Sequence, residues 1–127
     1  MKNKPIEKIK TLVVDDSARF RETIQIFLHD QSEIMLVGSV SSGAECLNLL
    51  DKNPADLVIM DARMSGLDGP ETTRKLKEKY HHVKVIICTV WAEEEACKYA
   101  LQSGADDYFV KGEPLSDLMS KIHALFS

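Results

Sequence analysis

Residues 57–61 read Leu-Val-Ile-Met-Asp, a short run of large apolar side chains that ends in a carboxylate. The run shows no polar alternation, which is typical of a strand buried on both faces, as in a parallel sheet covered by helices on each side. Further short runs rich in β-branched or aromatic residues lie at 11–14, 36–40, 83–90 and 108–110. We therefore expect five short strands in a parallel sheet.

The segments between these strands have the apolar spacing of amphipathic helices. Phe20, Ile24 and Leu28, for example, repeat every four residues, as the buried face of a helix requires. Stripes of this kind lie at 20–28, 44–50, 70–80, 96–100 and 115–125. Strand and helix thus alternate, and right-handed crossovers then predict an α/β fold: a flavodoxin-like (βα)5 doubly wound sandwich with a five-stranded parallel sheet in the order 2-1-3-4-5.

Composition limits the class of protein. The chain has 127 residues, of which 44% are hydrophobic and 28% charged, and its net charge of −4 excludes a strongly basic nucleic-acid binder. The three cysteines form no C-x-x-C pair, residues 1–5 are not followed by an apolar segment of a signal peptide, and no apolar run has the roughly 18 residues of a membrane span. We expect one cytoplasmic domain over residues 1–127, with a core of about 8–126, no effector domain in this chain, no membrane contact and no direct binding of nucleic acid.

Carboxylates follow the first and third predicted strands: Asp15 and Asp16 after one, Asp61 after the other. In a doubly wound sheet, ligands bind where the winding reverses, outside the carboxyl ends of these two strands. Like charges held together there repel one another unless a divalent cation neutralises them. Because all the ligands are oxygens, and an incomplete cage leaves room for water, the pattern favours Mg²⁺ over Ca²⁺.

A carboxylate beside such a cation can also be a nucleophile, since aspartate forms acyl phosphates. Thr89 near the end of the fourth run offers a hydroxyl and Lys111 after the fifth an ammonium group, and phosphoryl transfer uses both kinds of group. Taken singly, each has an ordinary alternative: Asp16 or Ser17 could cap the first helix, Asp61 could be a loop acid, Thr89 an ordinary strand residue and Lys111 a solvated lysine. Their common place at one edge of the sheet favours a joint site.

Four segments in chain order resemble the receiver domain of two-component response regulators. They are LVVDDSARFR at 12–21, DLVIMDARMSGLDG at 56–69, VIICTV at 85–90 and GADDYFVK at 104–111. The resemblance extends over almost the whole chain, from about residue 8 to residue 126. It implies a phosphorylation-dependent signalling switch that assists only its own phosphorylation and dephosphorylation and is otherwise not an enzyme.

The resemblance also implies how the phosphoryl group is received. Asp61 would be the acceptor, and a histidine kinase or a phosphotransfer protein would be the donor. Asp15, Asp16 and Asp61 would bind Mg²⁺ together with the backbone carbonyl of Arg63. The side chain of Arg63 either leans over the site toward the phosphate or is simply solvated.

By the same resemblance, Thr89 and Lys111 would contact the phosphoryl oxygens. Thr89 and Tyr108 would act as the switch, remodelling the surface formed by the helix at 96–100, the strand at 108–110 and the helix at 115–125. A downstream effector domain or protein, or a second copy in a homodimer, would read this change.

Some residues depart from the family pattern. Ser65 stands where relatives usually have proline, which frees a backbone donor. Val90 replaces a common alanine or glycine, and with Trp91 beside it we expect its bulk to narrow access to the acyl phosphate and slow hydrolysis. Gly112 replaces a proline preceded by a cis bond; because a cis bond before glycine costs roughly 2.5–4 kcal/mol, we expect a trans bond and a last helix that starts at Pro114.

Other functions stay open at this point. A degenerate receiver would bind partners without phosphorylation. An aspartyl-phosphate phosphatase is less favoured, because the first acids are adjacent rather than spaced D-x-D, and an FMN carrier would find Asp15 and Asp16 where it needs a phosphate loop. The segment VGSVSSGAECL at 37–47 resembles receivers joined to helix-turn-helix domains, which points to transcription regulation in a longer protein. Candidate interface residues are Trp91, Lys98 and Tyr99.

Overall fold

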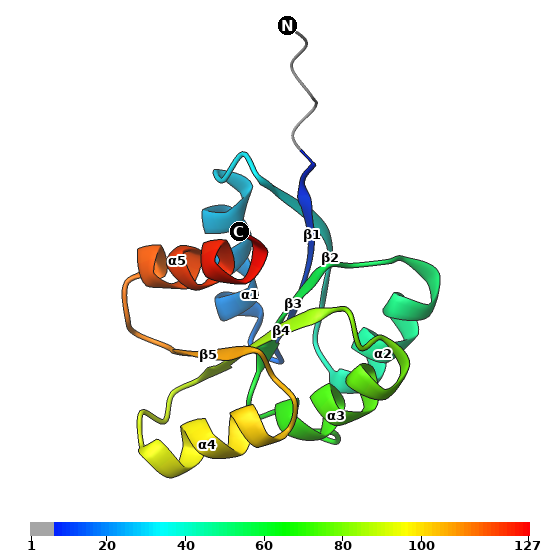
Figure 1. Ribbon diagram of the computed structural model, residues 1–127, viewed down its shortest axis with the longest axis vertical. Coiled ribbons are helices and arrows are strands. Elements are labelled where there is room, and N and C mark those ends of the chain that lie inside the picture. The colour runs from blue at the N-terminus through cyan, green and yellow to red at the C-terminus, as the bar shows by residue number, and fades with distance from the viewer. Residues whose placement is uncertain (1–6) are drawn as a thin grey trace, which may run out of the picture.

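Strands and helices alternate without interruption in the computed structural model, which describes residues 7–127 (Figure 1). The strands are β1 (Ile9–Val14), β2 (Ile34–Val40), β3 (Leu57–Asp61), β4 (Lys84–Thr89) and β5 (Asp107–Val110). The helices are α1 (Ala18–His29), α2 (Gly43–Lys52), α3 (Gly69–Lys79), α4 (Glu94–Gln102) and α5 (Leu115–Phe126). Residues 1–5, on which the expectation about a signal peptide rests, lie outside the described residues.

The sheet has the predicted order, β2-β1-β3-β4-β5, and every pairing is parallel. β1 lies between β2 and β3, so the winding reverses beside it, and ligands of such sheets bind at the carboxyl ends of these strands. The strand ends differ slightly from prediction. β1 begins at Ile9 because Ile9 and Lys10 already pair with β2, and β4 ends at Thr89, which leaves Val90 outside the sheet.

Two helical layers cover the sheet. Helices α1 and α5 lie on one face, and α2, α3 and α4 on the other (Figure 1). Along β1, Leu12 and Val14 belong to the core under α2, α3 and α4, whereas Val13 belongs to the core under α1 and α5. Because all three are fully buried, β1 is apolar on both faces, and each such side chain contributes about 1.5–3 kcal/mol. No helix within residues 7–127 has the length and apolar character needed to cross a membrane.

The helix starts are fixed to different degrees. The Ser17 hydroxyl accepts from the backbone of α1, and Asp68 forms a capping box with Glu71 at the start of α3. Helix α4 has no side-chain cap. Pro114 occupies the N-cap of α5, so this helix begins one residue later than the sequence predicts.

The connection from β5 to α5 has an all-trans backbone. No cis peptide bond occurs among the described residues, so the expected trans bond between Lys111 and Gly112 is confirmed. Gly112 has a φ of 103°, a left-handed conformation that glycine adopts without steric cost.

Helix α3 begins directly against the end of β3. The amide of Gly69 donates to the carbonyl of Ala62 at 2.9 Å. A Cβ atom at Gly69 would overlap the carbonyl oxygen of Asp61 and lie 2.9 Å from Cα of Ala62. Since both neighbours are backbone, neither can turn aside, and this close approach holds the end of β3 in place.

We therefore expect Gly69→Ala to lower the free energy of unfolding by at least about 2 kcal/mol, despite the better helix propensity of alanine. Urea denaturation measures the change. Gly66→Ala is the matched control: Gly66 has a φ of 77° but nothing within 4 Å of an added Cβ, so it should cost only about 1–2 kcal/mol. If the Gly69 variant were as stable as the wild-type chain, the close packing described here would be wrong.

Candidate functional site

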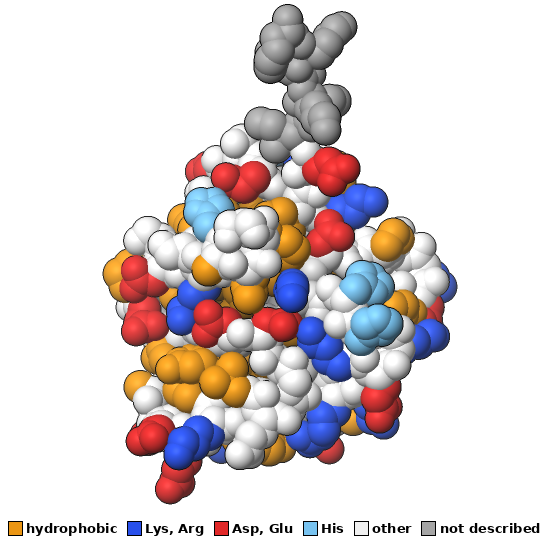
Figure 2. All heavy atoms as spheres, in the orientation of Figure 1, with side chains coloured by type: hydrophobic (Ala, Val, Ile, Leu, Met, Phe, Trp, Pro, Cys, Tyr) orange, Lys and Arg blue, Asp and Glu red, His pale blue; other side chains and the backbone are white. Residues whose placement is uncertain are grey.

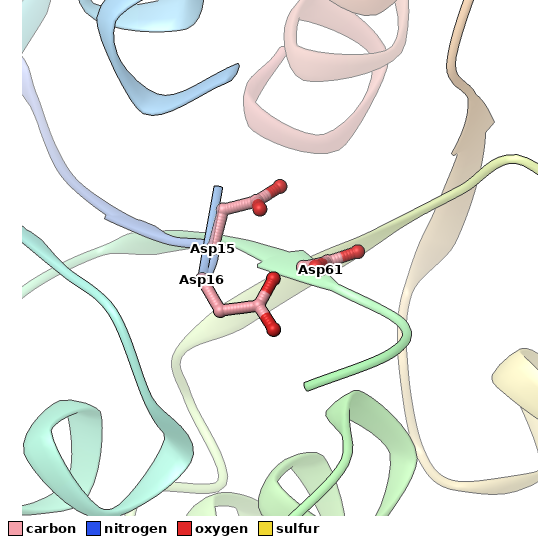
Figure 3. A group of neighbouring side chains, drawn as sticks. All are labelled: Asp15, Asp16 and Asp61. Carbon is pink, nitrogen blue, oxygen red and sulfur yellow. The ribbon is translucent and has the colours of Figure 1, made fainter. Parts of the chain in front are cut away.

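Three carboxylates meet at the carboxyl ends of β1 and β3 (Figure 3). Asp15 and Asp16 directly follow β1, and Asp61 is the last residue of β3. One oxygen of each lies within 4.8 Å of the others. Asp15 and Asp61 are only 1% and 7% exposed, whereas Asp16 is exposed. The sequence predicts this juxtaposition, because the ends of neighbouring parallel strands share one edge of the sheet.

Local hydrogen bonds orient two of the carboxylates. The Ser17 amide donates to Oδ1 of Asp15 at 2.8 Å, and the Arg63 amide donates to Oδ1 of Asp61 at 3.4 Å. Ser17 rather than Asp16 caps α1, so the interpretation of Asp16 as a helix cap is wrong. The side chain of Asp16 therefore stays in the cluster.

Lys111 connects the two buried acids. Its Nζ donates to Oδ2 of Asp15 at 2.8 Å and to Oδ1 of Asp61 at 3.1 Å, so the alternative of a solvated lysine is wrong. The same Nζ lies 4.1 Å from the ring centroid of Phe20, a cation–π distance. The periodicity identifies Phe20 only as a core residue of a helix. Its position one turn into the helix that follows the acid pair is the signal that could have placed it at the site.

A second residue that the sequence reasoning missed is Arg21. Its Nη1 donates to the backbone carbonyl of Asp15 at 2.5 Å, which ties the end of β1 to α1. A cation in the first turns of this helix is common, and only the three-dimensional arrangement shows that it faces the strand end. Arg21 thus supports the backbone of Asp15, whereas Lys111 binds its side chain.

The charges at this site do not balance. Burial and the charge of Asp15 together raise the pKa of Asp61 to about 6, although Lys111 opposes both effects. Burial alone would lower the pKa of Lys111, but its hydrogen bond to Asp15 and the charge of Asp61 outweigh this and raise it. Three carboxylates against one ammonium group leave an excess of negative charge. A set of oxygen donors with this excess fits a hard divalent cation such as Mg²⁺.

A cavity of about 240 Å³ opens beside Asp61. Thr89, at the end of β4, forms part of its wall and is buried, and its Oγ accepts a hydrogen bond from the Trp91 amide at 3.0 Å. Val90 also lines the cavity and is 64% exposed, so it lies at the mouth. The complete lining is Asp61, Ala62, Arg63, Thr89, Val90, Trp91 and Lys111.

Two further predicted residues lie at the edge of this arrangement or outside it. The Arg63 guanidinium is exposed and stands 5.6 Å from the ring centroid of Trp91, at the rim of the cavity. Tyr108 is half-buried on β5 and does not line the cavity. A hydrogen bond with Cys97 of α4 raises the pKa of Tyr108, and Lys121 of α5 lies 5.1 Å from its ring centroid. Tyr108 thus joins β5 to α4 and α5 rather than to the carboxylates.

Comparison with known proteins identifies the family to which the chain belongs. The chain matches the response regulator receiver domain family over residues 11–123. It is 36% identical over 119 residues to the response regulator GacA of Pseudomonas aeruginosa and 34% identical over 119 residues to the response regulator protein VraR of Staphylococcus saprophyticus. Each match covers 94% of this chain, which spans 56% and 57% of the respective relatives, a little over half their length.

Solved structures agree with this relationship. The signal receiver domain of the response regulator NarL from Mycobacterium tuberculosis superposes with a TM-score of 0.86 at 26% identity, covering 94% of this chain and 96% of that one. Its strand order and helix arrangement are therefore those of this chain. With the family match extending over nearly every element of the sheet and both helical layers, the chain belongs to the response regulator receiver domains of two-component systems.

Proposed function

We propose that this chain is a signalling switch controlled by phosphorylation of Asp61. Asp15, Asp16 and Asp61, with the backbone carbonyl of Arg63, would hold Mg²⁺. The observation that carries the proposal is the position of Asp61: its buried carboxylate borders a cavity, lies 3.1 Å from the Lys111 ammonium, and has two further carboxylates within 4.8 Å.

Phosphoryl transfer to Asp61 requires an ionised oxygen held at the cavity. An Oδ atom attacks the phosphorus of the donor, and a new O–P bond forms while the bond to the leaving group breaks with its electron pair. In a histidine kinase or phosphotransfer protein the leaving atom is an imidazole nitrogen. Mg²⁺, when bound, offsets the negative charge of the transferred group.

Lys111 and Thr89 complete the site. The Lys111 Nζ, already within 3.1 Å of Asp61, donates to a phosphoryl oxygen. The Thr89 Oγ accepts from the Trp91 amide, which leaves its own hydrogen free to donate to the phosphoryl group. A shift of Thr89 toward the phosphoryl group therefore pulls on the segment that precedes α4.

That segment leads to the proposed output surface. Tyr108 contacts α4 through Cys97 and α5 through Lys121, so it responds to movement of α4. Phosphorylation would bias the α4-β5-α5 surface between two states, which an effector or a second copy then reads. We infer a cytoplasmic receiver domain with a core of about 8–126. Because the segment at 37–47 resembles receivers joined to helix-turn-helix domains, and the relatives are longer than this chain, we further propose that it regulates transcription as part of a longer protein.

Incubation with Mg²⁺ and acetyl phosphate tests the acceptor role. We expect mass spectrometry to show an increase of one phosphoryl group in an acid-stable, base-labile adduct that is absent in Asp61→Asn. The exposed Asp30, which caps the C-terminus of α1 and lies outside the cluster, provides the control variant Asp30→Asn, which should be phosphorylated like the wild-type chain. No adduct would favour a degenerate receiver, and steady release of phosphate from an external substrate would favour a phosphatase.

The raised pKa of Asp61 predicts a pH-dependent stability in the absence of divalent cations. The ionised group is disfavoured in the folded state, so it lowers stability above about pH 6, and the cost disappears below the unfolded pKa near 4. Asp61→Asn should therefore be more stable than the wild-type chain at pH 7.5, by about 1–3 kcal/mol. Urea denaturation in EDTA measures this gap, which should shrink as the pH falls from 6 to 4. A gap that does not change with pH would contradict the charge imbalance.

The position of Val90 predicts its effect on hydrolysis. Because its side chain stands at the cavity mouth, Val90→Ala should open the approach for water and shorten the lifetime of the phosphorylated state about threefold, a barrier change of less than 1 kcal/mol. Loss of the adduct over time measures the lifetime. Ile26→Ala, an equally exposed position on α1, is the control and should leave it unchanged. An unchanged or longer lifetime in Val90→Ala would disprove the shielding role.

A further inference from the structure

A groove of about 680 Å³ lies between α3 and α4, next to the cavity at Asp61. About half of its surface is apolar, and Met64, Pro70, Ile87, Ala96 and Ala100 supply part of this apolar lining. The two alanines leave room between the helices because their side chains are short. A volume of this size accommodates one or two large side chains of another molecule.

Two exposed aromatic side chains form walls of the groove. Trp91 and Tyr99 are 45% and 46% exposed. Of the six large hydrophobic side chains exposed within residues 7–127, four lie between residues 90 and 101. Exposed apolar side chains gathered in this way mark interaction surfaces, and tryptophan and tyrosine are the residue types that anchor them.

Arginine side chains hold these walls in place. The guanidinium of Arg63 lies 5.6 Å from the ring centroid of Trp91, and that of Arg74 lies 5.9 Å from the ring centroid of Tyr99. Each aromatic ring is therefore restrained before any partner arrives. Such preorganisation reduces the entropy lost on binding.

The rim of the groove is acidic. Asp68, Glu71, Glu93 and Glu95 line it together with one base, Arg63, while Arg74 lies near Asp68 and Glu71 on the α3 side. Asp68 and Glu71 cap α3, whereas Glu93 and Glu95 form no ion pair with any residue in 7–127. Figure 2 shows acidic side chains gathered over the start of α4. This charge repels phosphate groups of nucleic acids and lipids and attracts cations.

We propose that the α3–α4 groove binds a segment of a partner protein that carries an aromatic or aliphatic anchor flanked by lysine or arginine. The anchor fills the apolar floor between Trp91 and Tyr99, and the flanking cations pair with Glu93 and Glu95. This goes beyond the proposed phosphorylation switch, because the groove is present in the unphosphorylated chain. Ala62 and Thr89 line both the groove and the Asp61 cavity, so a bound segment contacts residues next to the acceptor.

Peptide selection on the unphosphorylated full chain tests the proposal without depending on phosphorylation. A random peptide library displayed on phage should yield sequences in which an apolar residue is flanked by lysine or arginine. Their affinities are then measured by fluorescence anisotropy against two matched pairs of variants. Chemical-shift mapping of the bound peptide should place it along α3 and α4.

The first pair compares charge. Glu95→Lys should weaken binding about fivefold, and Glu94→Lys less than about twofold, although both change the net charge equally and both lie in the first turn of α4. Glu94 pairs with Lys98 and does not line the groove.

The second pair compares apolar contacts. Tyr99→Ala should weaken binding at least about fivefold, and Leu101→Ala, equally exposed but outside the groove, less than about twofold.

Several results would overturn the proposal. One is a selection with no basic preference, and another is equal effects within each pair of variants. A third is a peptide that maps to α1 and α5. Concentration-dependent dimerisation that buries the groove and is not displaced by the selected peptides would identify a second copy of the chain as the occupant instead.

Discussion

The site depends on the contact of Lys111 with two buried carboxylates. The reversal of winding between β1 and β3 brings Asp15 and Asp61 together, and neither can escape into water because both belong to the buried edge of the sheet. Burial and the charge of Asp15 raise the pKa of Asp61, and Lys111 offsets only part of this rise. The fold therefore leaves an excess of negative charge at the site, which a bound divalent cation would neutralise. A more complete set of basic side chains would stabilise the metal-free protein but remove the reason to bind the cation.

Elements on both sides hold this arrangement in position. Arg21 and Phe20 reach the site from α1, and the close approach of Gly69 fixes the end of β3 from the opposite layer. Thr89 differs from these supports. Its backbone ends β4, and its side-chain Oγ accepts a hydrogen bond from the Trp91 amide. The acid cluster is thus supported from both layers, while Thr89 is joined to the segment before α4 by a side-chain hydrogen bond that a phosphoryl group can compete for.

The sequence predicts the fold and the site to different extents. The sheet order and the convergence of Asp15, Asp16 and Asp61 follow from apolar runs that end in acids, because a strand end fixes where the next side chain emerges. Whether Asp16 or Ser17 caps α1 does not follow, since either side chain can cap and the local backbone decides. The positions of Phe20 and Arg21 at the site are not predicted, because helical periodicity distinguishes buried from exposed faces but does not show which strand end a helix approaches. The sequence does not predict the groove between α3 and α4 for a related reason. Ala96 and Ala100 have the periodicity of core residues whether or not another side chain fills the space next to them.

Helix α4 buries smaller side chains than the other helices do. It begins without a side-chain cap, carries acids in its first turn, and contributes only Cys97 and Ala100 to the buried core, whereas α1 and α5 insert larger side chains. Small buried side chains contribute less apolar area, so α4 is held to the sheet by a smaller free energy than its neighbours. A helix held weakly can change position at a small cost in free energy when Thr89 moves. The short side chains that α4 turns toward the core also leave space for the groove beside α3. The choice of alanine on this face of α4 therefore serves both the mobility that a switch needs and the space that a partner would occupy.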